Sequence, residues 1–395
     1  MAKCFYNSSN LILTNVTEEE LAAIDIFHCH AESTIVFALV LCLILIILGI
    51  PGNLITVVAL AWDKKVRNAT ALFIINLHIS NLMVCIMILP LSASALAQNH
   101  WVYGKAMCVA YAYIRFTLAT SSILSILAIT ITRFILVCFP FSYLKIYNRR
   151  NISIMILVIW VSALTMYMPY YFGALGGFGL DSNQGFCTII YEKNGGILYL
   201  SFGYVLPILI MIICYFKIWW TATKMKRKMQ NLSSCPSNNV TYNSNNTRSA
   251  LRPIVNRDSS SQGHTDTSDS EETPPSSEAN NPGGRNTIAE VFQATFRTAK
   301  KTDRVKAPTR KDKKLFTMII AIIVAYSFMQ LPVMINRILI LDKPKYPFTM
   351  VMLQMVNFAG YCINPIIYVF MSKEYRQAYS KLFRMIMHNL RRIRN

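Results

Sequence analysis

A few polar and charged side chains lie inside long apolar runs, where burying them is costly. Arg115 and Arg133 lie in one such run, and Asn364 directly precedes Pro365 in another. An arginine at that depth can bind an anionic group or pair with an acid. A proline removes one helical hydrogen bond, so the helix around Pro365 should bend. These residue types indicate ligand recognition and conformational switching rather than the breaking of bonds.

The sequence carries no pattern that predicts catalysis. It has no nucleophile triad, no phosphate-binding loop and no cluster of metal ligands. His28, His30 and His100 could approach one another, but three scattered histidines are weak evidence of a metal site. We therefore expect a protein that is not an enzyme, with no catalytic residue, no cofactor and no metal.

Seven apolar runs of membrane-spanning length position these residues. About 20 apolar residues cross the ~30 Å hydrocarbon core of a bilayer as a helix. Of the 395 residues, 54% are hydrophobic and 15% are charged, as in membrane proteins. The predicted fold is an all-α membrane protein, a seven-transmembrane helix bundle with a short amphipathic eighth helix. The expected spans are 35–61, 70–97, 105–138, 152–172, 197–222, 315–340 and 348–371.

Basic residues gather on one side of the spans and set the predicted topology. The formal net charge is +20, and Lys and Arg cluster in the first, third and fifth loops and in the tail. Cytoplasmic loops are enriched in these residues, so the N-terminus is predicted outside and the C-terminus inside. The same clustering argues against nucleic acid as a partner. We expect a multi-pass protein of the plasma membrane, glycosylated at the outside sequons Asn7 and Asn15.

The chain divides into regions of different composition. The fifth loop, which is the third on the inner side, is rich in Ser, Asn, Thr and Pro. It should be largely disordered, because it has too little apolar area to offset chain entropy. An apolar stripe after the last span predicts an amphipathic helix on the inner membrane surface, formed by Tyr375, Tyr379, Leu382, Phe383 and Ile386. The expected regions are an outside tail at 1–34, spans one to five at 35–222, the loop at 223–313, spans six and seven at 314–371, and the amphipathic helix and tail at 372–395.

Four cysteines lie on the outer side in this topology. Cys108 begins the third span, and Cys187 lies in the loop before the fifth. Because the extracellular side is oxidising, we expect them to form a disulfide, with two free thiols as the alternative. Such a bond would tie the loop over the outer end of the bundle. Cys4 and Cys29 could pair with each other.

The two arginines of the third span lie at different depths. Arg115 is about two turns, roughly 10 Å, inward from the outer end of its span. It either anchors an anionic group of a ligand or pairs with an acid of the outer loop, such as Asp181 or Glu192. Arg133 lies near the inner end, where it could pair with Asp312 in a closed bundle and be freed in an open one.

Intramembrane amides occur on three of the spans. Asn53, Asn81 and Asn364 fall on spans one, two and seven, and each is satisfied only by a polar partner or water. We therefore expect the three to form one polar cluster. Ser122 shares a face of the third span with the two arginines, and Pro332 should kink the sixth.

Taken together, these residues resemble the rhodopsin-like family of G-protein-coupled receptors. The match covers nearly the whole chain except the N-terminal tail and the long inner loop. It depends on the order and spacing of Gly52-Asn53, Leu77 with Asn81, Trp101 with Gly104, Cys108, Arg133, Trp160, Cys187, Pro207, Tyr215, Pro332 and Asn364-Pro365-Ile366-Ile367-Tyr368. Within the family, the strings Gly179-Leu180-Asp181 and Phe186-Cys187-Thr188-Ile189 are similar to the invertebrate moody and trapped-in-endoderm group, and melatonin receptors match less well.

The resemblance implies a receptor that binds an extracellular ligand and activates a heterotrimeric G protein when span six swings outward. Arrestin, receptor kinases and membrane lipid are further expected partners. The ligand, which Arg115 suggests is anionic, should contact Arg115, Phe116, Ala119, Val333 and Gln354. The switch and coupling residues should be Thr132, Arg133, Phe134, Tyr215, Asp312, Gln330, Pro332, Asn364, Pro365 and Tyr368.

Three positions depart from the family pattern. Thr132 replaces the usual acid before the inner arginine, Asn81 replaces the acid of span two, and Gln330 replaces the usual tryptophan before the span-six proline. An amide is a poor sodium ligand, so a sodium site is not expected. The three changes support a hypothesis of raised basal activity. The alternatives are a seven-span transporter, although no internal repeat is present, and a receptor-like scaffold that acts without ligand.

Overall fold

The computed structural model describes residues 11–12, 17–23, 25–27, 30–63, 68–181, 185–191, 193–233, 310–339 and 347–394. The chain forms two compact units, and residues Met1–Met225 and Pro308–Asn395 make up the one that holds the bundle. Most of the second unit, Lys226–Ala307, lies outside the described residues. The predictions for Asn7, Asn15, Cys4 and Cys29 also lie outside them.

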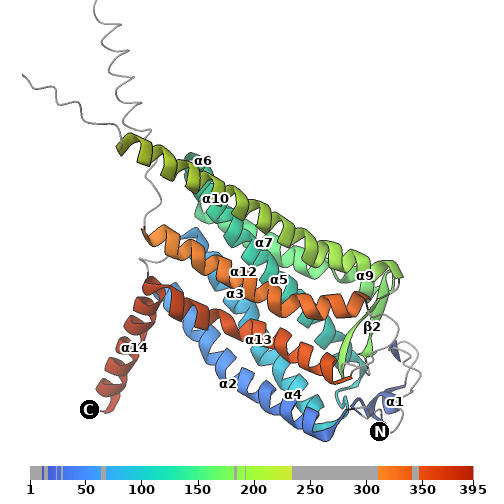
Figure 1. Cartoon of the computed structure of the whole chain (residues 1–395). Coiled ribbons are helices and arrows are strands. Elements are labelled where there is room, and N and C mark those ends of the chain that lie inside the picture. Colours follow the sequence, from blue (N-terminus) through green and yellow to red (C-terminus); the bar gives the residue numbers. More distant parts are fainter. Residues whose placement is uncertain are drawn as a thin grey trace, which may run out of the picture. The chain divides into compact units, whose positions relative to one another are not determined.

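Seven helical spans form the bundle, as the apolar runs predict (Figure 1). Six are long and apolar enough to cross a membrane among the described residues, and the remaining one contains the shorter apolar helix Thr317–Val333. The spans are α2 (Glu32–Trp62); α3 (Ala69–Met83) with the π-helical turn η2 (Val84–Ile88) and α4 (Leu89–Gln98); α5 (Gly104–Cys138); α7 (Arg149–Thr165) with α8 (Met168–Tyr171); α9 (Lys193–Leu200) with the π-helical turn η3 (Ser201–Val205) and α10 (Leu206–Ser233); α12 (Arg310–Leu339); and α13 (Pro347–Met371).

A side-chain cap and buried polar contacts fix the start of α3 and its packing against neighbouring spans. Asn68 caps α3 by accepting a hydrogen bond from the Ala71 amide at 3.0 Å. Further along α3, the Asn76 amide donates to Ser125 of α5 at 2.8 Å and accepts from the Trp160 indole of α7 at 3.0 Å. One amide thus joins three spans, which fixes their register where apolar packing alone would allow sliding.

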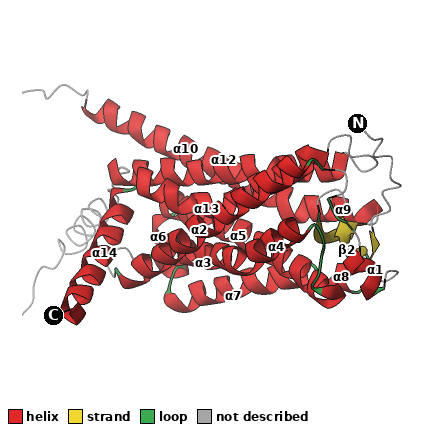
Figure 2. Cartoon of the chain, turned by 90° about the horizontal axis from the view of Figure 1, so that it is seen from below, coloured by secondary structure: helices red, strands yellow, loops and turns green. Residues whose placement is uncertain are grey.

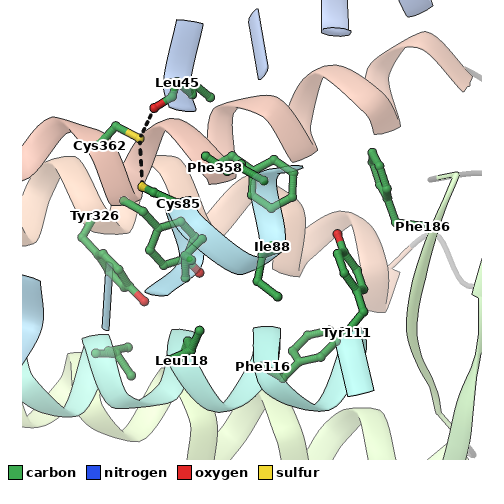
Figure 3. Close-up of a cluster of buried hydrophobic side chains, with 14 of the residues drawn as sticks. Leu45, Cys85, Ile88, Tyr111, Phe116, Leu118, Phe186, Tyr326, Phe358 and Cys362 are labelled. Carbon is green, nitrogen blue, oxygen red and sulfur yellow. Dashed lines mark hydrogen bonds between the residues drawn. The ribbon is translucent and has the colours of Figure 1, made fainter. Parts of the chain in front are cut away.

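Three helices approach one another closely at a glycine of α2. A Cβ added to Gly49 would lie 2.6 Å from the Sγ atoms of both Cys85 and Cys362. These two thiols, from η2 and α13, are 3.8 Å apart, and Cys362 also donates to the Leu45 carbonyl (Figure 3). Only a residue without a side chain lets α2 pack this closely against both neighbours.

A small antiparallel sheet covers one end of the bundle, the end that the charge pattern predicts to be outside and that we call the outer end. Strand β2 (Gly176–Asp181) pairs with β3 (Phe186–Tyr191) on one edge and with β1 (Leu11–Ile12) on the other. Figure 2 shows these strands beside α1 (Glu18–Ala23), at the end of the helices away from α14. The predicted disulfide is present: Cys187 of β3 bonds Cys108 of α5, across 79 residues of sequence. The sheet is therefore attached covalently to the third span.

The N-terminal segment packs over the outer end and forms what we call the lid, residues 17–23 and 25–27. Its Leu21, Ile26 and Phe27 are almost fully buried. The Glu18 carboxylate accepts from the Lys105 amide at the start of α5, at 2.9 Å. Gly185 has a φ of +69°, and an added Cβ there would lie 2.0 Å from the Phe27 ring. The sequence indicated only an outside tail here, because these short apolar groups have no clear period.

The inner end carries the amphipathic helix α14 (Lys373–Arg394), which is longer than expected. Tyr375, Ala378 and Leu382 form its buried face, and Ala59 of α2 belongs to the same apolar cluster as Ala378 and Leu382. In the predicted stripe, Phe383 is 65% exposed and Ile386 is 44% exposed, so neither packs closely on the bundle. Their contact with the membrane surface stays a prediction.

Candidate functional site

Arg115 lies in α5 under the sheet and is only 5% exposed. Its guanidinium donates a hydrogen bond to the side-chain oxygen of Gln354 on α13. It also lies 5.5 Å from the centroid of the Phe116 ring and 5.3 Å from that of Phe358. The structure therefore brings three of the predicted ligand contacts together, Arg115, Phe116 and Gln354, and adds Phe358. Cation–π contacts with two rings reduce the cost of burying the charge.

An aromatic column connects this arginine to the lid. The Phe27 ring lies 6.1 Å from that of Phe186, and Phe186 lies 6.3 Å from Phe358, all with rings edge to face. Figure 3 shows Phe186, Phe358, Phe116 and Tyr111 around the outer half of the bundle. The rings of this column are almost fully buried. The site thus lies beneath a layer of packed aromatic rings.

The other two predicted ligand contacts lie deeper or on another helix. The carbonyl of Ala119, one turn inward from Arg115, accepts from the Tyr326 hydroxyl at 3.2 Å. Val333 is buried on α12. Neither contributes a polar group toward Arg115, so their role in ligand contact stays a prediction.

The position of the missing tryptophan holds a hydrogen-bond network. Gln330 is buried, donates to the Tyr361 hydroxyl at 3.3 Å and accepts from the Asn357 amide. Both partners belong to α13, so α12 and α13 are joined by polar contacts just inward of Pro332. The sequence identified the departure but not these partners, because nothing in the spacing alone shows which face of α13 meets α12.

No direct hydrogen bond joins the three intramembrane amides among the described residues. The Asn53 amide donates to the carbonyls of Gly49 at 2.9 Å and Tyr361 at 3.1 Å. Asn81 accepts from the Ser122 hydroxyl at 3.0 Å, as the polar-core prediction requires. The Nδ2 atoms of Asn81 and Asn364 have no hydrogen-bond partner among the described residues. A cluster that the three amides form through water therefore stays a prediction.

His78 is a buried polar residue that the sequence reasoning missed. It lies on α3, is fully buried, and its Nδ1 is 2.7 Å from Oδ1 of Asn53. Its ring centroid is 5.2 Å from that of Tyr368. The sequence could have identified His78, because an ionisable residue inside an apolar span is a functional candidate, which is the argument that selected Arg115.

Tyrosines surround Arg133 at the inner end of α5. The partly buried guanidinium interacts electrostatically with the phenols of Tyr143, Tyr215 and Tyr375. Burial raises the pKa of the Tyr375 hydroxyl, and the charge of Arg133 opposes that shift. The Tyr375 ring stacks on that of Tyr368 with centroids 5.0 Å apart.

The remaining switch residues have local partners. Thr132 donates to the Ala128 carbonyl at 2.7 Å, so it does not substitute for an acid beside Arg133. Phe134 packs edge to face on Phe139 at 5.7 Å. Pro332 and Pro365 lie inside α12 and α13. The side chain of Asp312 lies outside the described part of the chain, so its pairing with Arg133 stays a prediction.

Comparison with known proteins identifies the family. Residues 52–368 match the 7 transmembrane receptor (rhodopsin family). The chain belongs to this family. A crystal structure of squid rhodopsin superposes with a TM-score of 0.65 at 18% identity, covering 90% of this chain and 87% of that one. The fold is therefore that of a multi-pass membrane receptor, and membership in a receptor family agrees with the expectation that the chain is not an enzyme.

Relatives within the family match half of the chain or more. The G-protein coupled receptor moody of Drosophila pseudoobscura pseudoobscura is 32% identical over 379 residues, 88% of this chain and 52% of that protein. Protein trapped in endoderm-1 of Drosophila melanogaster is 26% identical over 373 residues, 93% of this chain and 82% of that protein. The melatonin receptor type 1A of Phodopus sungorus is 28% identical over 200 residues, 50% of this chain and 55% of that protein. The chain spans about half the length of the moody receptor.

Proposed function

We propose that the chain is a plasma-membrane receptor, with its N-terminus outside, that binds an extracellular ligand and activates a heterotrimeric G protein. The observation that carries this proposal is the single helix α5, which has the buried Arg115 in its outer half and the partly buried Arg133 near its inner end. Arg115 lies under the sheet with Gln354, and Arg133 lies among tyrosines at the inner end. A rigid element with a recognition group and a coupling group can transmit a ligand's preference for one conformation.

The outer group favours an anionic ligand with an apolar body. A guanidinium is the preferred partner of carboxylate and phosphate groups. The amide nitrogen of Gln354 is buried and has no hydrogen-bond partner, so it can donate a further bond to the same anion. Phe116 and Phe358 flank the guanidinium and supply apolar contact.

The inner group supports coupling through a population shift. A ligand that binds one arrangement more tightly moves the equilibrium toward it. In the arrangement that couples, the inner end of α12 moves outward, and Arg133, Tyr215 and Tyr368 rearrange around the C-terminal helix of Gα. Arrestin and receptor kinases would recognise the same open face. Thr132, Asn81 and Gln330 replace three groups that hold such bundles closed, so we expect raised basal activity.

The test is guanine-nucleotide exchange on a panel of purified Gα subunits, using membranes that carry the full chain. Arg133→Ala should abolish receptor-dependent exchange, while Arg115→Ala should retain basal exchange and lose the response to acidic ligands. Lys145→Ala, an inner basic residue next to α7, controls for general loss of charge. Exchange that is the same with and without Arg133 would contradict the proposal. Basal exchange no higher than that of a Thr132→Asp, Asn81→Asp variant would contradict the raised basal activity.

A further inference from the structure

A fully buried imidazole lies between the first span and the inner end of the last one. His78 of α3 contacts Asn53 of α2 through its Nδ1 atom, 2.7 Å from Oδ1. Its ring faces the Tyr368 ring of α13 at 5.2 Å, with an interplanar angle of 56°. Tyr368 therefore packs against two rings, those of His78 and Tyr375.

The partners of Asn53 determine which nitrogen of His78 carries the proton. The Asn53 Nδ2 donates to two backbone carbonyls, those of Gly49 and Tyr361. This fixes the amide orientation, because a carbonyl oxygen in place of Nδ2 could not bond to either acceptor. Oδ1 therefore faces His78 and can only accept. The proton lies on Nδ1, and in a neutral imidazole Nε2 is then an acceptor.

That acceptor and a nearby donor are both unsatisfied. His78 Nε2 and the Tyr368 hydroxyl are buried, and neither has a hydrogen-bond partner in the described part of the chain. Leaving buried polar atoms unpaired is costly, and a single buried water can bond to a donor and an acceptor on facing rings. The chemistry of the two groups is complementary, since the phenol donates and the bare nitrogen accepts.

We propose that His78 is a positioning residue for Tyr368, accepting a hydrogen bond from its hydroxyl through one bridging water. The contact joins α3 to the inner end of α13 and holds Tyr368 in its place against Tyr375. Release of this contact lets Tyr368 move toward Arg133 and the G protein. The signalling consequence rests on the proposed function, whereas the contact itself does not.

The test compares two amide variants. Each keeps the hydrogen-bonding group near one nitrogen of the imidazole and removes the group near the other. His78→Asn places its amide near Nδ1, so it keeps the bond to Asn53 and loses the acceptor toward Tyr368. His78→Gln is the matched control, because its longer side chain places an amide oxygen near Nε2. Each variant is made alone and together with Tyr368→Phe, and basal exchange on Gα is measured per receptor at the cell surface.

The expected result is a non-additive cycle. His78→Asn raises basal exchange about fivefold, the factor that corresponds to the loss of one hydrogen bond, and His78→Gln restores most of the difference. With Tyr368→Phe in place, His78→Asn has no further effect. Equal effects of His78→Asn in both backgrounds would overturn the proposal, and so would no effect in either.

A second measurement keeps the proposal separate from the function on which it partly rests. The four chains of the cycle, namely the unchanged chain, His78→Asn, Tyr368→Phe and the double variant, are purified in detergent, and their thermal unfolding midpoints are compared. Non-additive midpoints without exchange on any Gα would support the His78–Tyr368 contact and contradict G-protein coupling. Additive midpoints would contradict the contact itself, whatever the exchange measurements show.

Discussion

The outer and inner ends of the bundle are held by different kinds of contact. At the outer end, a disulfide, a three-stranded sheet and the buried lid side chains fix the helices over Arg115. At the inner end, the contacts between α14 and the bundle are a small apolar cluster, single hydrogen bonds, stacked tyrosine rings and one partly exposed ion pair. A covalent and apolar end keeps one geometry, whereas an end held by separate weak contacts can exchange partners at low cost.

This difference indicates that the two ends of α5 have different roles, ligand recognition at the outer end and coupling at the inner end. A ligand site benefits from a fixed frame, since less freedom is lost on binding. A coupling face must instead adopt two arrangements that differ by only a few kcal/mol. Changes at the outer end should therefore reduce stability most, and changes at the inner end should alter signalling more than unfolding.

Breaking the disulfide should have the largest effect on stability. Cys187→Ser frees β3 from α5 and should lower the free energy of unfolding by about 2–4 kcal/mol. Purified receptor would show a lower thermal unfolding midpoint and lower surface expression. Cys214→Ser, at a buried free thiol on α10, is the control. An unchanged midpoint in Cys187→Ser would show that the sheet holds the outer end without the bond.

Loosening the lid should have a smaller and local effect. Phe27→Ala removes a buried ring worth about 1.5–3 kcal/mol, but the lid can open without unfolding the bundle. Hydrogen exchange should therefore rise in β2 and β3, while the global unfolding midpoint falls less than in Cys187→Ser. Phe172→Ala, at a ring that is 76% exposed, should leave both unchanged. If exchange rose equally in all the spans, the outer end would not be a separate unit.

Removing the Tyr379 hydroxyl of α14 should lower the free energy of unfolding by about the contribution of one hydrogen bond. The Thr56 hydroxyl donates to the Gly52 carbonyl at 2.7 Å, so it accepts from Tyr379 at 3.0 Å. Tyr379→Phe leaves that acceptor with one partner fewer and should lower stability by about 1 kcal/mol. The thermal midpoint of purified receptor measures it, with the exposed Tyr171→Phe as control. A loss as large as that in Cys187→Ser would contradict the contrast between the two ends.

The ion pair of α14 should contribute least. Lys381 and Asp63 are 2.7 Å apart, but the lysine side chain is 51% exposed. Lys381→Ala should change stability by about 0.5 kcal/mol or less, because solvent screens exposed pairs. The change should vanish at high salt. Unfolding of both chains at low and high ionic strength measures this, and a salt-independent loss would show that Lys381 acts through packing.

The sequence predicted what periodicity, charge and cysteine chemistry determine. The spans follow from the length of apolar runs, and the Cys108–Cys187 bond follows from two cysteines on the oxidising side. The three-stranded sheet was not predicted, because β3 is buried on both faces and so shows no alternation between apolar and polar residues.

Contacts between spans were harder to predict than the spans themselves. Arg115 and Gln354 were both selected, but on separate grounds, and only the fold shows that they bond. The amides of Asn53, Asn81 and Asn364 were expected to meet, but the direct partners found are the Tyr361 carbonyl for Asn53 and the Ser122 hydroxyl for Asn81. A helix sequence shows which residues share a face, but the rotation of neighbouring helices decides which side chains touch.

The close approach at Gly49 has a consequence for how the sequence can drift over evolution. Because an added Cβ would overlap both thiol sulfurs, the volumes at positions 49, 85 and 362 are coupled. A lineage that acquires alanine at position 49 must first, or at once, lose volume at the positions of Cys85 and Cys362. The three positions should therefore change as a set, although they lie on three different helices and more than 300 residues separate the first from the last.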